Sequence, residues 1–366
     1  MKFRSSKENL IETINIVQKA VSAKSTLPIL EGILIEAEEN LKMTGNDLEI
    51  GIESYIDAEI IEKGSLVINS KIFGDIIRRL PDSEVTIESN EKNIVTIECE
   101  NSHFEIKGMS SEGFPTIPEI KAENSFSISQ KVLRDMIRQT IFAIGTDEYR
   151  PVLMGSLMEY KNNELNLISI DGNRIALRTH PVEKEINELS IVIPGKTLNE
   201  IVKILPPEDD EIKICNSQNQ IMFDTGKFKV VSRLIEGEFL NYRYIMPEDY
   251  ETKVTISTKD LLSSIERAYL IIMEEKEKRY PIRINVANDK MIIMSNTETG
   301  SVREELSIEM SGKKIEIGFN PRYFIEALKA IDDEAVVIYF TSNLGPCTIK
   351  PIEGNSFAHM ILPIRL

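Results

Sequence analysis

Gly195, Lys196 and Thr197 are residue types that could bind the phosphate of a nucleotide. They follow an apolar run and precede an amphipathic one. This pattern predicts a strand, a tight turn and a helix, the setting in which backbone N–H groups wrap a phosphate. A phosphate-binding loop also needs an earlier glycine, at position 190 here, where serine stands. The motif therefore indicates nucleotide binding only weakly, and a nucleotide-hydrolysing enzyme is held as an alternative.

A metal site is not predicted, because the cysteines and histidines are few and scattered. The sequence has no Cys-x-x-Cys pair, and no two histidines lie within reach of one another on a helix or hairpin. Widely spaced single cysteines are typical of buried or half-buried strand residues in a reducing cytoplasm. The residues concerned are Cys99, Cys215, Cys347, His103, His180 and His359.

Catalytic motifs are not found either. The patterns of serine hydrolases and of zinc proteases are absent from the sequence. Asp171 could serve as a catalytic carboxylate, but beside Gly172 it is interpreted as the turn residue of a hairpin, like Asp47 in an equivalent stretch. We therefore expect a protein that is not an enzyme and carries no cofactor.

The composition is that of a globular protein with 366 residues, 42% hydrophobic and 28% charged, which fits two or three domains. No apolar run approaches the length of about 18 residues that spans a bilayer, and the N-terminus lacks an apolar signal core. We expect a cytoplasmic protein without a membrane partner. Taken as an average, the net charge of −16 argues against nucleic acid, because phosphate contacts need lysine and arginine.

The chain contains three copies of one pattern. SLVINSKIFGDIIRRLPDSEVTI (65–87) matches SIVIPGKTLNEIVKILPPEDDEIKI (190–214), and KIEIGFNPRYFIEALKAIDDEAVVI (314–338) is the third copy. Each copy reads as a strand, a turn with a basic residue, a helix, an acidic turn and a strand. Lys71, Lys196 and Arg322 occupy equivalent places, whereas Gly195 is not repeated. The Gly-Lys-Thr stretch is therefore interpreted as a strand-to-helix junction, which disfavours the nucleotide hypothesis.

A longer amphipathic helix precedes each copy, within residues 2–21, 125–144 and 253–272. Each repeat then amounts to about 120 residues, with two helices on mostly antiparallel sheets. We predict an α+β fold of three domains, 1–122, 123–250 and 251–366, with boundaries at polar, proline-containing segments.

Charge is divided unevenly between the six predicted helices and the rest of the chain. The helices carry +7 within a total of −16, so the remaining residues carry −23. One interpretation is that helices simply favour lysine and arginine. The other is a basic helical face that holds a polyanion loosely, while the acidic remainder repels casual contact with nucleic acid.

Five stretches resemble the bacterial DNA polymerase sliding-clamp family, the beta subunit of DNA polymerase III. They are TLPIL (26–30), YRPVLMG (149–155), SIDGNRIAL (169–177), SRLIEGEF (232–239) and LPIRL (362–366). Their order and spacing extend the resemblance over the whole chain. It implies three tandem clamp domains and a head-to-tail homodimer whose six domains form a ring around duplex DNA. Such a ring is a processivity factor, and a weak basic lining that reads no bases suits its sliding.

The resemblance also implies which residues face DNA. Five match basic positions of the family: Lys24, Lys71, Arg78, Arg150 and Lys196. Six more follow from the charges on the predicted helices: Arg79, Arg134, Arg138, Lys203, Arg322 and Lys329.

Sliding clamps carry a pocket for short peptides of the polymerase, of clamp-loader subunits and of other clamp-binding proteins. Its implied wall is Leu153, Ile170, Gly172, Asn173, Arg174, Ile175, Tyr242, Ile245, Met360, Leu362, Pro363, Ile364 and Arg365. An apolar groove with a few polar anchors suits apolar side chains of varied partners. Leu240 and Tyr244 depart from the family pattern, so the peptide preference is not predicted.

The implied subunit interface has Phe104 and Ile106 on one side and Ile271 and Ile272 on the other. Head-to-tail contacts that close on themselves give a finite ring. The alternative is a monomeric three-domain binding protein, which would form no ring.

Overall fold

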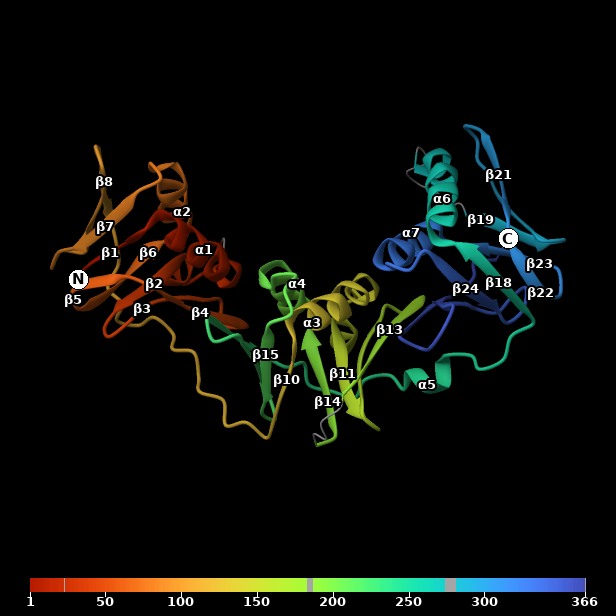
Figure 1. The fold of residues 1–366 in the computed structure, drawn as a ribbon, viewed down its shortest axis with the longest axis horizontal. Helices are drawn as coiled ribbons and strands as arrows, with labels where there is room; N and C mark the ends of the chain where they lie inside the picture. The colour runs from red at the N-terminus through yellow and green to blue at the C-terminus, as the bar shows by residue number, and fades with distance from the viewer. Residues whose placement is uncertain (23, 183–186, 274–280, 366) are drawn as a thin grey trace. The chain divides into compact units, whose positions relative to one another are not determined.

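The computed structural model describes residues 1–22, 24–182, 187–273 and 281–365. The chain divides into two compact units, one of Met1–Lys131 and Lys203–Leu234 and one of Val132–Val202 and Ile235–Leu366 (Figure 1). This division falls inside the predicted middle domain.

The first unit is built on two antiparallel sheets. In spatial order, the five-stranded sheet is β5 (Glu59–Glu62), β1 (Lys2–Ser6), β7 (Glu84–Ser89), β8 (Ile94–Cys99) and β9 (Ser102–Lys107). The eight-stranded sheet is β10 (Asn124–Ser129), β15 (Glu211–Asn216), β16 (Gln220–Asp224), β17 (Phe228–Arg233), β4 (Ile50–Ile56), β3 (Leu41–Asn46), β2 (Gly32–Ala37) and β6 (Gly64–Asn69).

Helices α1 (Lys7–Val17) and α2 (Ser70–Arg79) of this unit lie side by side (Figure 1). The side chains of Ser6 and Asn69 cap them by accepting backbone N–H groups of the first turn. A Cβ at Gly74 of α2 would lie 2.6 Å from Nε2 of Gln18, the end of a flexible side chain in the short 3₁₀ helix η1 (Gln18–Ala20). A further 3₁₀ turn, η2 (Pro28–Glu31), leads into β2.

The second unit has a nine-stranded and a four-stranded antiparallel sheet. The nine strands are β14 (Leu189–Pro194), β11 (Gly155–Lys161), β12 (Glu164–Ile170), β13 (Arg174–Pro181), β26 (Phe357–Ile361), β25 (Cys347–Pro351), β24 (Ala335–Phe340), β18 (Thr252–Ser257) and β22 (Glu309–Gly312). The four strands are β21 (Ser301–Ser307), β20 (Lys290–Asn296), β19 (Ile282–Ala287) and β23 (Ile315–Phe319).

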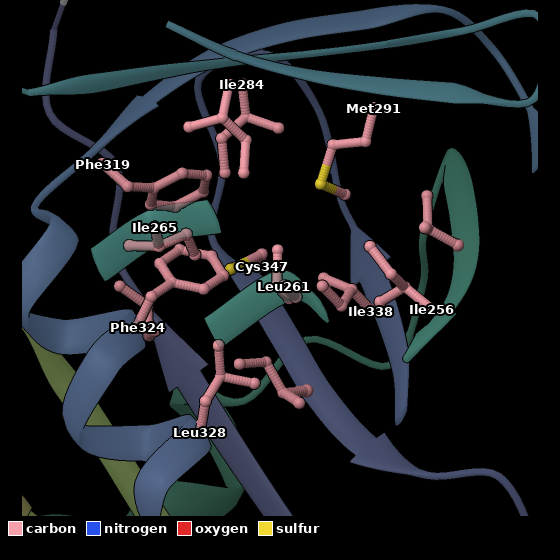
Figure 2. Packing of buried hydrophobic residues seen from close by; sticks show 14 of the residues in the cluster. Ile256, Leu261, Ile265, Ile284, Met291, Phe319, Phe324, Leu328, Ile338 and Cys347 are labelled. Atoms are coloured by element: carbon pink, nitrogen blue, oxygen red, sulfur yellow. The ribbon is translucent and has the colours of Figure 1, made fainter. Parts of the chain in front are cut away.

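The helices of the second unit are α6 (Thr258–Met273), α7 (Pro321–Ala330), the single turn α5 (Tyr242–Ile245), and the 3₁₀ turns η3 (Ile141–Ala143) and η4 (Pro151–Met154). Leu261 and Ile265 of α6 pack with Phe324 and Leu328 of α7 over the sheets (Figure 2). The rings of Phe319 and Phe324 meet edge to face, with centroids 5.1 Å apart.

Cys347 lies within this core (Figure 2), and Cys99 and Cys215 are buried and free as well. The prediction of buried strand cysteines is therefore confirmed.

Two helices cross the division between the units. Helix α3 (Gln130–Arg138) begins in the first unit and ends in the second, and α4 (Gly195–Ile204) runs the other way. All six predicted helices are thus present, in an α+β fold as predicted.

The threefold repeat is visible in the backbone pairing. An isolated antiparallel bridge covers the edge of one strand in each copy, at Val67–Met109, Val192–Ile235 and Gly318–Ile364. Strands of successive copies also join edge to edge, β17 to β4 in the first unit and β13 to β26 in the second. These two joins make each large sheet continuous.

The structure explains the glycine of the Gly-Lys-Thr stretch by packing. A Cβ at Gly195 would lie 2.9 Å from Cδ1 of Ile144 and 3.0 Å from the carbonyl oxygen of Met154. Glycine is therefore required where α4 begins against these two residues, and no phosphate is needed to account for it.

Candidate peptide groove and basic helix faces

An apolar cluster in the second unit brings together side chains from segments that are distant in the sequence. Its buried members include Leu153, Ile170, Ile175, Tyr242 and Met360, from η4, β12, β13, α5 and β26. Leu362 and Phe239 pack against them. Five predicted groove residues thus lie in one buried cluster, and a sixth borders it.

A tight turn between β12 and β13 forms one end of this cluster. Oδ1 of Asp171 accepts hydrogen bonds from the backbone nitrogens of Asn173 (2.9 Å) and Arg174 (3.1 Å), and Gly172 has a φ of +91°. The nitrogen of Leu362 donates to the carbonyl oxygen of Asn173 at 2.9 Å. The turn therefore fixes the segment after β26, and Asp171 is the turn residue that was predicted.

Arg174 is buried in this site, with 8% of its surface exposed. Its guanidinium donates to Asp171 (2.8 Å), to Glu326 of α7 (2.5 Å) and to the carbonyl oxygen of Phe142 (2.5 Å). The aromatic ring of Tyr323 stacks on the guanidinium, 4.5 Å from Cζ to the ring centroid. Its guanidinium is therefore already hydrogen-bonded within the protein, and the place of Arg174 in the groove wall stays a prediction.

Tyr323 and Glu326 were not predicted as part of this site. They lie about 150 residues after Arg174, and no local sequence pattern indicates which residues so far apart will be hydrogen-bonded in the fold. The one sequence signal for these two residues is the third copy of the repeat, which predicts that they lie on a helix.

The remaining predicted groove residues lie at the rim. Gly172, Asn173, Ile245 and Arg365 are exposed, and Leu362, Pro363 and Ile364 are half-buried. Ile364 is held by a hydrogen bond from its nitrogen to the carbonyl oxygen of Gly318, at 2.8 Å. Tyr244, which departs from the family pattern, is 90% exposed beside Ile245. Leu366 lies outside the described residues.

The first unit repeats the turn, beside a pocket that is lined in part by Leu48, Ile117 and Val231. Oδ1 of Asp47 accepts from the nitrogens of Glu49 and Ile50, and the nitrogen of Arg233 donates to the carbonyl oxygen of Glu49 at 3.1 Å. Here, however, Ile117 lies over Gly51, with Cδ1 2.7 Å from where a Cβ would stand. Residues 115–118 line the pocket at this join, whereas the second unit has Ile175 at the place that matches Gly51.

Most of the predicted DNA-facing side chains are exposed. Nine belong to exposed residues: Lys24, Lys71, Arg78, Arg79, Arg150, Lys196, Lys203, Arg322 and Lys329. Several already have acidic neighbours, such as Lys329, whose Nζ lies 2.8 Å from Glu266. Exposed pairs of this kind leave the cation accessible and contribute little stability.

Arg134 and Arg138 differ from this group because both are half-buried. The guanidinium of Arg138 donates to the carbonyl oxygen of Ala330 at 3.0 Å and pairs with Asp135 and Asp332. Its guanidinium therefore contacts the end of α7, and its role as a DNA-facing residue stays a prediction.

The predicted interface residues lie on two elements. Phe104 is exposed and Ile106 half-buried on β9, an edge strand of the five-stranded sheet. On α6, Ile271 is half-buried, but Ile272 is 7% exposed and belongs to the core. Leu270 is 63% exposed, so the outward position at this end of α6 is Leu270 and not Ile272.

Comparison with known proteins places the chain in a family. Models of the N-terminal, central and C-terminal domains of the DNA polymerase III beta subunit match residues 1–118, 127–241 and 243–365. The chain belongs to the DNA polymerase III beta subunit family. The resemblance seen in the sequence and the fold of three tandem clamp domains are therefore confirmed.

Individual sliding clamps agree over their full length. The beta sliding clamp of Staphylococcus epidermidis is 36% identical over 376 residues, covering 100% of this chain and 99% of that protein. That of Halalkalibacterium halodurans is 33% identical, covering 100% of both. The crystal structure of the Bacillus subtilis sliding clamp superposes with a TM-score of 0.96 at 30% identity, covering 100% of this chain and 99% of that one. The predicted role in DNA replication as a sliding clamp follows from this membership.

Among the described residues, no helix is both long and apolar enough to cross a membrane.

Proposed function

We propose that this chain is a processivity factor that catalyses no reaction itself. Two copies associate head to tail into a ring of six domains, encircle duplex DNA and slide along it while holding the polymerase. The full-length match to sliding clamps is the observation that carries this proposal. Each chain contributes three domains, with boundaries at 1–122, 123–250 and 251–366.

The charge distribution supports an interaction with DNA that does not read its sequence. Nine exposed basic residues on or beside helices offer contacts to phosphate, within a chain of net charge −16. A ring needs only weak contacts, because the link to DNA is topological. An acidic remainder then limits unproductive binding to nucleic acid elsewhere.

Two sheet edges support the proposed dimer. Within the described residues, β9 pairs only with β8 and β21 only with β20, so each leaves one row of backbone groups for another strand. Phe104 on β9 and Leu270 near the end of α6 are exposed apolar side chains that a partner copy would cover. We propose Phe104 and Ile106 on one face, and Leu270 and Ile271 on the other.

The apolar groove of the second unit is proposed to bind short peptides of the polymerase, of clamp-loader subunits and of other clamp-binding proteins. Its buried floor of leucine, isoleucine and methionine suits apolar side chains, and its exposed rim at Asn173, Ile245 and Arg365 can contact the peptide backbone.

Three buried free cysteines are consistent with a cytoplasmic location.

The proposal is tested by topological retention. The protein is threaded onto linear duplex DNA attached to a bead at one end, and the free end is then blocked with streptavidin. We expect retention through a wash at high salt, and release when a restriction enzyme cuts the DNA. Release by salt from uncut DNA would contradict encirclement and would indicate an ordinary electrostatic complex.

A further inference from the structure

Glu159 lies on β11 beside the apolar cluster of the groove. It stands two residues after Leu157, a buried member of that cluster, and therefore on the same face of the strand. Its side chain is only 14% exposed. A carboxylate so placed needs hydrogen-bond partners to remain charged.

The partners of Glu159 both come from the single helical turn α5. The phenol oxygen of Tyr242 donates to Oε2 at 3.0 Å, and the guanidinium of Arg243 donates to Oε1 at 3.1 Å and also to Oε2. Cζ of Arg243 lies 4.7 Å from the centroid of the Tyr242 ring. Burial acts to raise the pKa of Glu159, but the hydrogen bonds from Arg243 and Tyr242 outweigh it and lower that pKa. The carboxylate is therefore charged at neutral pH.

Helix α5 depends on such an anchor. It has four residues, and its N-cap residue Asn241 makes no side-chain capping bond. One turn of helix is not stable in water by itself, because nucleation costs more than a single backbone bond returns. The three hydrogen bonds to Glu159 tie this turn to β11.

The same turn carries part of the groove. Tyr242 is buried in one cluster with Met360 and Leu153, while Tyr244 and Ile245 are exposed. Movement of α5 would therefore displace the buried ring of the groove and its exposed rim together.

We propose that Glu159 is a positioning residue for peptide binding, which holds α5 through Tyr242 and Arg243 so that the groove wall is preformed. It need not touch the peptide. This inference rests on the proposed peptide-binding function of the groove. A preformed wall raises affinity because less ordering remains to be done when the peptide binds.

The test measures the fluorescence anisotropy of a short labelled peptide that contains two leucines and a phenylalanine. A version with these residues replaced by aspartate shows background binding. Glu159→Gln keeps the shape of the side chain but removes its charge, and we expect about tenfold weaker binding, in the range for loss of a charged hydrogen bond. Glu316→Gln is the matched control, since it breaks the exposed Arg283 pair (2.7 Å) outside the groove, and its affinity should be that of the wild type.

A double-mutant cycle separates positioning from general destabilisation. If Glu159 acts through Arg243, then Glu159→Gln combined with Arg243→Met should weaken binding no more than either change alone. Arg243→Met, at an exposed residue, also tests the idea should Glu159→Gln fold poorly. Wild-type affinity in both single variants would overturn the role of Glu159. Failure of the wild type itself to bind any such peptide would overturn the groove proposal and this inference with it.

Discussion

Arg174 and Glu326 form an ion pair, with Nη1 of the arginine 2.5 Å from Oε2 of the glutamate. The arginine opens β13 and the glutamate lies on α7, so the pair joins a strand of the groove to a helix of the third repeat. Asp171, Phe142 and Tyr323 complete the surroundings of the guanidinium. The groove turn and α7 are therefore held as one piece.

This pair predicts a measurable loss of stability. Glu326→Gln removes one of the two carboxylates that balance the charge of the nearly buried Arg174 guanidinium. We therefore expect the free energy of unfolding to fall by about 1–2 kcal/mol. Urea unfolding followed by circular dichroism measures the change. Glu266→Gln, which breaks the exposed pair with Lys329, should cost less than about 0.5 kcal/mol. Equal losses in both variants would contradict the special role of Arg174.

Because His359 is buried, we expect the free energy of unfolding to fall in mild acid. Its ring is buried between Phe142 and Phe357, and burial lowers its pKa from 6.5 to about 3. Between these values the unfolded chain binds a proton that the folded chain does not, so stability is lost as pH falls below 6.5. From pH 7 to 5 the loss should be about 2 kcal/mol.

Replacement of the histidine isolates this effect. His359→Phe should remove about 2 kcal/mol of the pH dependence of unfolding between pH 7 and 5. An unchanged pH dependence in His359→Phe would show that the buried imidazole is not the cause.

We expect that replacing Gly195 disturbs packing and has no effect on nucleotide binding. Gly195→Ala forces a Cβ against Ile144 and the backbone of Met154, and should lower stability by about 1–3 kcal/mol. Gly300→Ala meets no atom within 4 Å and should be close to neutral. Calorimetry with ATP should detect no binding to the wild type. Tight ATP binding that Lys196→Ala abolishes would restore the nucleotide hypothesis.

We expect Arg79 to make a weak and salt-dependent contribution to DNA binding. Its side chain is exposed on α2, and Arg79→Gln should weaken binding to a labelled duplex about two- to threefold and reduce the salt slope by about 1. Lys63→Gln changes an exposed lysine between β5 and β6 and should leave both quantities unaltered. An equal effect of the two changes would show that DNA does not prefer the helical face.

The helices and the antiparallel sheets could be predicted from the sequence itself, because each depends on a local pattern or on the repeat. Leu153, Ile170 and Met360 were assigned to one groove by the resemblance to sliding clamps, and they do lie in one cluster. Helix phase was harder to predict. Each residue turns a side chain by about 100°, so the two residues from exposed Leu270 to buried Ile272 turn it by about 200°.

Partners brought together by tertiary structure could not be predicted. Arg138 reads as a free helical cation until Asp332 and Ala330 are placed beside it. Glu159 likewise reads as an ordinary charge on a strand, because Tyr242 and Arg243 of α5 approach it only in the folded chain. No periodicity encodes such contacts.

Small-angle X-ray scattering across a concentration series tests the central claim most directly. A ring of two chains predicts a particle of twice 41.6 kDa with the scattering of a hollow disc. A particle of 41.6 kDa at every concentration, without a central hole, would contradict the dimeric ring.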